Sequence, residues 1–142
     1  MKVYGILVIL IATLLVWLPS NYALTKAQGS HDDNLITAEI LLAKLNKGEK
    51  VVILDVRSEG QYKSSAKRIK DDIRVEEAKE LDDKIKAISK DLEIVTYCSC
   101  PDEATSNYYV SLLKERGFKK AYALKGGYFA WLRIDGPIEP KK

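Results

Sequence analysis

The sequence predicts an α/β fold in three layers, with a mainly parallel central sheet flanked by helices. Strand-like and helix-like segments alternate along the 142-residue chain, as in strands that are joined by helical crossovers. Residues 51–54 form an unbroken apolar run, which is typical of a strand covered on both faces. Residues 93–127 then predict a strand, a loop with both cysteines, a helix, a second strand and a Gly-Gly turn.

Length and charge limit the possible organisation. A chain of 142 residues has room for one domain plus an appendage. Beyond residues 1–23, which hold one lysine, 22 basic and 20 acidic residues remain. The lysines between Lys47 and Lys90 alternate with acids, as on a solvated surface. We therefore expect a monomer that does not bind nucleic acid.

The N-terminus has the features of an export segment. Lys2 precedes the uncharged apolar run Val3–Leu18, and small or polar residues follow it. This pattern predicts a signal peptide over residues 1–23, cleaved after Ala23 or Ala27. The alternative is an uncleaved membrane anchor of similar extent. Either one predicts an exported protein, in the periplasm or elsewhere in the cell envelope.

Residues 24–34 are mostly polar and predict a tether between the export segment and a domain over residues 35–140. The tether contains His31, the only histidine of the chain. A single His in a tether is a poor candidate for a base or a ligand, since neither a Cys-His mechanism nor a zinc site has its other members. We therefore expect no metal and no cofactor.

The domain is expected to open with a helix that Thr37 caps and Gly48 ends. One side of this helix carries Ile40, Leu41 and Leu45. The apolar strand 51–54 follows and ends in Asp55 and Arg57. These two charges have two open roles: an ion pair that holds loops together, or direct contact with a substrate.

Three further elements complete the pattern around the cysteine segment. A short strand is expected over Ile73–Val75 and a helix over Val75–Lys90, with Leu81, Ile85 and Ile88 facing inward. A last short helix is expected over Tyr128–Ile134, and a tail over Pro137–Lys142.

The cysteines lie where a strand becomes a loop. Ile94–Cys98 has strand character, and Pro101 with Asp102 ends that run. Thr105 or Ser106 is expected to cap the following helix. Tyr109, Leu112 and Leu113 form its apolar stripe, and Gly117 ends it. A thiol is thus aimed at a helix N-terminus, where backbone amides favour a thiolate or a persulfide.

Cys98 and Cys100 leave two interpretations open. In an extended strand, residues i and i+2 are roughly 6.5 to 7 Å apart at Cα, the limit of disulfide reach, so a bond between them would be strained and labile. Such a bond would suit a thiol-disulfide redox protein, or one that forms a persulfide on one Cys and resolves it with the other. In the other interpretation Cys98 is a small buried core residue and only Cys100 reacts.

Two motifs resemble the rhodanese-like family. The first motif is Asp55-Val56-Arg57. The second is a strand that ends in Cys and is followed, at the family's spacing, by Gly117-Phe118, Leu124-Lys125-Gly126-Gly127 and Ala130-Trp131. Cys100 fits the spacing of the family's catalytic Cys without gaps, whereas Cys98 makes the loop two residues longer. The resemblance implies an active-site loop that includes Pro101, Asp102, Glu103, Ala104, Thr105 and Ser106.

The resemblance also implies a sulfurtransferase. In that family a thiolate takes a sulfane sulfur, becomes a persulfide and passes the sulfur on, with loop amides as stabilising donors. A small sulfur compound or a protein persulfide is the expected partner. The family's Asp and Arg help to fix the loops, which is carried over to Asp55 and Arg57. Tyr128, next to Gly-Gly, is a candidate to line a pocket.

The chain departs from the family pattern in two places. Residues 67–72, Lys-Arg-Ile-Lys-Asp-Asp, stand where Gly-His-Ile-x-Gly-Ala is expected, and Gly permits conformations that Asp tolerates less readily. The loop has no Arg but has Asp102 and Glu103, which predicts that thiosulfate is a poor donor. Two alternatives to a sulfurtransferase therefore stay open: a catalytically silent binding module, and a thiol-disulfide redox protein.

Overall fold

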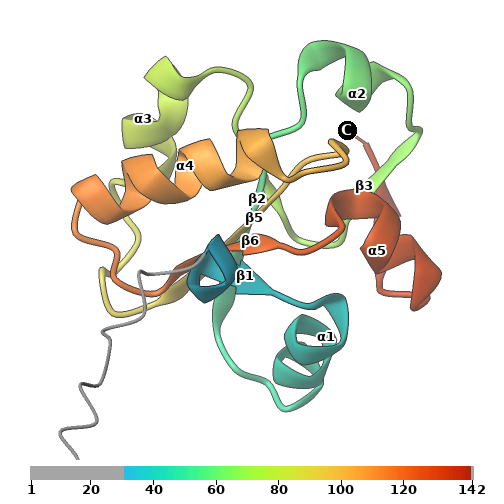
Figure 1. Cartoon of the computed structure of the whole chain (residues 1–142), viewed down its shortest axis with the longest axis horizontal. Coiled ribbons are helices and arrows are strands. Elements are labelled where there is room, and N and C mark those ends of the chain that lie inside the picture. Colours follow the sequence, from blue (N-terminus) through green and yellow to red (C-terminus); the bar gives the residue numbers. More distant parts are fainter. Residues whose placement is uncertain (1–30, 142) are drawn as a thin grey trace, which may run out of the picture.

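The computed structural model describes residues 31–141 (Figure 1). The strands in this range are β1 (Leu35–Ile36), β2 (Val51–Asp55), β3 (Lys67–Ile69), β4 (Ile73–Arg74), β5 (Glu93–Tyr97), β6 (Ala121–Leu124) and β7 (Ile138–Pro140). The helices are α1 (Ala38–Asn46), α2 (Glu59–Lys63), α3 (Leu81–Ile85), α4 (Ala104–Glu115) and α5 (Gly127–Arg133), with short 3-10 helices η1 (His31–Asn34) and η2 (Ala78–Glu80).

The expected signal peptide or anchor over residues 1–23, and residues 24–30 of the expected tether, lie outside the described residues. Between residues 31 and 141, no helix is long and apolar enough to cross a membrane.

The central sheet confirms the predicted α/β class. Its strand order is β1-β6-β5-β2-β4, and every neighbouring pair is parallel. β2 pairs with β5 over its whole length, from Val51 opposite Glu93 to Asp55 opposite Tyr97. The carboxyl ends of these two central strands therefore meet at one edge, with Asp55 beside the residue that precedes Cys98.

Helices cover both faces of the sheet, as the three-layer prediction requires. Figure 1 shows α3 and α4 on one side and α1 with α5 on the other. Side chains of β5 alternate accordingly: Ile94 packs into the core under α3 and α4, and Val95 and Tyr97 pack into the core under α1 and α5. This alternation follows from the two-residue period of a strand.

The first helix begins as predicted. Thr37 Oγ1 accepts a hydrogen bond from the Ile40 N–H at 3.4 Å, and Gly48 follows the helix with φ of +74°. Leu41 is fully buried, but the side chain of Ile40 is 50% exposed. Ile40 therefore does not share the buried side of the helix with Leu41, since neighbouring residues of an α-helix point in directions about 100° apart.

The predicted helix over Val75–Lys90 is wrong at both ends. Val75 lies outside any helix, directly after β4: its N–H donates to the Asp55 carbonyl at 3.0 Å and its side chain is buried. Helical structure covers only η2 and α3, because a tight turn follows in which the Ile88 N–H donates to the Ile85 carbonyl at 2.9 Å. Leu81 and Ile85 nevertheless face inward as predicted.

The C-terminal tail is a strand, which also differs from the prediction. β7 pairs antiparallel with β3, with Ile138 opposite Ile69. Arg68 joins the pair by donating to Glu139 Oε1 at 2.6 Å. The segment that replaces the family's Gly-His-Ile sequence is thus anchored by the end of the chain.

Candidate active site

Cys98 and Cys100 form a disulfide directly after β5. Their Cα atoms are 5.6 Å apart, within the common range for a disulfide. The larger separation expected from an extended strand is wrong, because β5 ends at Tyr97 and the chain bends at Ser99, between the two cysteines. Cys98 is fully buried, as predicted for a core residue, whereas Cys100 is partly exposed.

The Gly-Gly turn packs directly against Cys98. The Tyr128 N–H donates to the Cys98 carbonyl oxygen at 2.8 Å. Gly127 has φ of +52°, and a Cβ at this position would lie 2.2 Å from the same oxygen. Only glycine fits such an approach, so the turn fixes the backbone on which Cys98 sits.

The cysteine loop ends differently from the prediction. α4 begins at Ala104, and the preceding Glu103 has a left-handed backbone with φ of +54°. Neither Thr105 nor Ser106 caps the helix, because both lie inside its first turn. Ser106 is fully buried, and its hydroxyl has no hydrogen-bond partner within residues 31–141.

Both loop acids have structural roles at the start of α4. Asp102 Oδ1 accepts from the Ala104 N–H at 3.3 Å. Glu103 Oε1 accepts from the Gly126 N–H at 2.5 Å, which ties the loop to the Gly-Gly turn. Asp102 and Pro101 are exposed, so one negative charge of the loop faces solvent.

α2 holds the other side of the loop. Gln61 Oε1 accepts from the Ser99 N–H at 3.4 Å and also from the Ser58 N–H at 3.2 Å. Ser58 Oγ in turn accepts from the Gln61 N–H at 3.3 Å, so the two residues form a capping box. Gln61, whose side chain helps to cap α2, therefore also positions Ser99 between the two cysteines.

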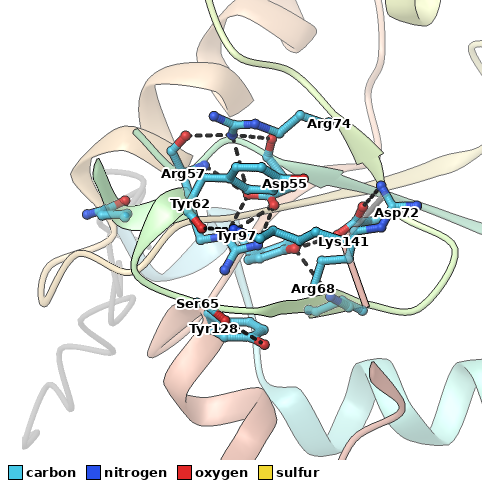
Figure 2. A network of polar contacts seen from close by, with 12 residues as sticks. Asp55, Arg57, Tyr62, Ser65, Arg68, Asp72, Arg74, Tyr97, Tyr128 and Lys141 are labelled. Atoms are coloured by element: carbon cyan, nitrogen blue, oxygen red, sulfur yellow. Dashed lines mark hydrogen bonds and ion pairs between the residues drawn. The ribbon is translucent and has the colours of Figure 1, made fainter. Parts of the chain in front are cut away.

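Asp55 and Arg57 form the ion pair that the sequence predicts as one of two roles (Figure 2). Both side chains are fully buried, and Arg57 Nη2 lies 2.6 Å from Asp55 Oδ2. Burial is the largest single influence and acts to lower the pKa of Arg57, but the hydrogen bonds to Asp55 together with the charges of Tyr97, Asp55 and Tyr128 raise the pKa overall. The guanidinium also lies 4.5 Å from the centre of the Tyr128 ring, so it links the strand end to the Gly-Gly turn.

A second buried network surrounds Asp72, a residue for which the sequence predicts no role of its own. The Tyr97 hydroxyl donates to Asp72 Oδ2, and Arg68 Nη1 lies 3.1 Å from Asp72 Oδ1 (Figure 2). Burial raises the pKa of Asp72 to about 6, and it also raises the pKa of Tyr97 together with the charges of Asp55 and Asp72. The one sequence signal for this network is that Asp72 stands where the family pattern has the small residue Ala.

The backbone of this loop keeps a glycine-like conformation without glycine. Asp71 stands at the second Gly of the expected Gly-His-Ile-x-Gly-Ala segment and has φ of +60°. Asp is among the residues that tolerate this region best. Asp71 in place of Gly therefore keeps the left-handed backbone at this position of the loop.

A groove of about 460 Å³ opens beside the cysteine loop. Its lining includes Ser99, Tyr128, Phe129, Leu132 and Ile138. Phe129 is 56% exposed at its rim. Tyr128 thus lines a pocket as the sequence predicts, although most of its side chain is buried.

A parallel α/β sheet with a cysteine loop at the carboxyl end of a central strand defines the class of rhodanese-like domains. Residues 37–134 match the Rhodanese-like domain family, and the protein belongs to that family. A search of curated proteins returned no match.

Solved structures agree with this assignment. The rhodanese-like domain of the Alr3790 protein from Anabaena sp. is 31% identical, with a TM-score of 0.63, over 76% of this chain and 80% of that one. A full-length protein from Lactobacillus plantarum is 26% identical, with a TM-score of 0.67, over 78% and 91%. A rhodanese-related protein from Thermoplasma volcanium is 21% identical, with a TM-score of 0.59, over 76% and 99%, and supports the fold alone.

Proposed function

We propose that the protein is a sulfurtransferase that, when reduced, carries sulfane sulfur as a persulfide on Cys100. The observation that carries the proposal is the partial exposure of Cys100 in a loop that leads into α4 of a rhodanese-like domain. The Cys100 thiolate attacks the sulfane sulfur of a donor, and the donor leaves as a thiolate. A second acceptor then takes the sulfur from Cys100.

The charge of the loop favours donors that are neutral or basic. Residues 98–106 contain two acids and no Lys or Arg. The nearby Arg57 is fully buried and paired with Asp55, so it offers no free charge to an incoming anion. Asp102, the exposed acid of the loop, repels an anion that comes within a few ångströms of it by about 1 kcal/mol. A small persulfide or a protein persulfide is therefore the proposed donor, and thiosulfate a poor one.

The location in the cell envelope is part of the same proposal. Its support is the basic start and the apolar run of residues 1–23, which have the composition of a signal peptide or an anchor. The proposed domain over residues 35–140 then acts outside the cytoplasm, as a monomer.

Mass spectrometry of the reduced full chain tests the activity. The Cys98→Ser variant is treated with cysteine persulfide or with thiosulfate, and Cys100→Ser is its matched control. We expect Cys98→Ser to gain one sulfur that cyanide removes, faster from the persulfide, and Cys100→Ser to gain none. Equal rates with both donors would contradict the proposed donor class. The absence of an adduct in both variants would favour the catalytically silent module.

A further inference from the structure

We propose that Cys98 resolves the persulfide on Cys100, so that the protein releases hydrosulfide and acts as a persulfide reductase with a dithiol as its second substrate. This inference rests on the proposed function and deepens it. It starts from the Cys98–Cys100 disulfide, which joins residues only two positions apart. A crosslink that closes so short a loop restricts the unfolded chain little. The bond is therefore a state of a reaction cycle and not a staple of the fold.

The two sulfurs differ in access, which assigns their roles. Cys98 is fully buried and belongs to the core under α4, while Cys100 packs on the edge of that core and is partly exposed. A donor or a reductant from solvent reaches Cys100. Sulfane sulfur is therefore loaded on Cys100, and Cys98 is shielded from every thiol except its neighbour.

Cys98 is held in place to act on that neighbour. Its carbonyl oxygen is bound by the Tyr128 N–H, and the Gly127 backbone packs against it. The Cys100 N–H lies 3.4 Å from the Cys98 sulfur and points to it as a donor. Such a donor stabilises the Cys98 thiolate, both when it attacks and when it leaves.

The resolving step is balanced without another oxidant. The Cys98 thiolate attacks the inner sulfur of the Cys100 persulfide, a bond forms between the two Sγ atoms, and the bond from Cys100 Sγ to the outer sulfur breaks. The outer sulfur leaves with the electron pair as hydrosulfide and takes the proton that Cys98 gave up. The sulfane sulfur is reduced, and the two cysteines are oxidised to the disulfide.

A dithiol closes the cycle. One thiolate of the dithiol attacks the accessible Cys100 sulfur, and Cys98 leaves as a thiolate that is then protonated. The second thiol of the reductant attacks the mixed disulfide, which frees Cys100 and leaves the reductant oxidised. Per turn, one persulfide and one dithiol give one thiol, one hydrosulfide and one oxidised dithiol.

A single-turnover experiment on the reduced full chain tests the step. Wild type and Cys98→Ala are mixed with one equivalent of cysteine persulfide and quenched with acid over time. Sulfide and protein mass are then measured. Wild type is expected to release one sulfide and to end two hydrogens lighter, and dithiothreitol is expected to restore its starting mass. Cys98→Ala is expected to keep a persulfide that cyanide removes and to release sulfide at least about tenfold more slowly, since it lacks the neighbouring thiol.

The outcomes separate this inference from the proposed function. If wild type keeps a persulfide as long as Cys98→Ala does, the resolving role is wrong and the sulfurtransferase stands. If neither protein takes up sulfur, the sulfurtransferase proposal fails, and the resolving role fails with it.

Thermal unfolding of the wild type tests the premise independently. Because the disulfide closes a short loop, the oxidised and the reduced protein are expected to unfold at nearly the same temperature. A reduced protein that no longer folds would show that the bond is a structural crosslink and would overturn the inference.

Discussion

The backbone N–H of Tyr128 donates to the carbonyl oxygen of Cys98 at 2.8 Å, and this contact joins the end of β5 to the first turn of α5. It is possible because Gly127 leaves room: a Cβ there would lie 2.2 Å from the same oxygen. The second glycine of the turn therefore serves the cysteine loop rather than the turn alone.

Replacing Gly127 with Ala is expected to lower the free energy of unfolding by about 3 kcal/mol or more, because a strained positive φ and a clash with a fixed backbone atom act together. Urea unfolding measures the loss. Gly48→Ala is the matched control, since Gly48 has φ of +74° with nothing within 4 Å of a Cβ. It is expected to cost about 1 kcal/mol, from backbone strain alone. Equal losses at both positions would contradict the close contact with Cys98.

Arg57→Ala is expected to destabilise the protein by roughly 3 kcal/mol, because the fully buried Asp55 carboxylate loses its closest partner and keeps only the longer ion pair with Arg74 at 3.5 Å. Thermal or urea unfolding checks the loss. Lys63→Ala serves as a control: it breaks the exposed pair with Glu59 and is expected to cost less than about 0.5 kcal/mol. A loss for Arg57→Ala as small as that of the control would show that the buried pair does not hold the strand end.

Asp72 is expected to make stability depend on pH. Burial raises its pKa from 3.8 to about 6 in the folded protein, against the lowering effects of Tyr97, Arg68 and Arg57. The folded state therefore holds the proton more tightly than the unfolded one. The resulting stabilisation is fully present below the unfolded pKa and is lost as the pH rises through about 6.

The measurement compares wild type with Asp72→Asn, which cannot titrate. Between about pH 3.5 and about pH 8, the wild type is expected to lose about 3 kcal/mol of stability relative to the variant. Urea unfolding across this range gives the difference. A difference between the two proteins that does not change with pH would contradict the raised pKa.

Asp102→Lys is expected to raise the rate of persulfide formation from thiosulfate by about tenfold, because it replaces a repelling charge on the exposed loop with an attracting one. The rate with cysteine persulfide is expected to change less. Mass spectrometry on a Cys98→Ser background follows the adduct. Asp91→Lys is the control, because it makes the same charge change at an exposed turn outside the loop. An equal gain in both variants would point to net charge rather than to the loop.

The sequence by itself determined the fold class and the capping of α1 by Thr37, and it offered the Asp55–Arg57 ion pair as one of two roles. Each of these depends on neighbours along the chain. An apolar run marks a buried strand, a hydroxyl three residues ahead of an amide marks a cap, and two charges that close a strand lie near each other in any fold. The spacing from the cysteine segment to the Gly-Gly turn also indicated the rhodanese-like family.

The tertiary structure alone decided how distant segments close on one another. β7 pairs with β3 across about 70 residues of chain, and Glu103 binds Gly126. Such contacts depend on the packing of the whole sheet, so no local pattern predicts them. The same holds for the buried network of Asp72 and for the 5.6 Å separation of Cys98 and Cys100, because the point at which β5 ends was set by its neighbouring strands and by the Gly127 backbone.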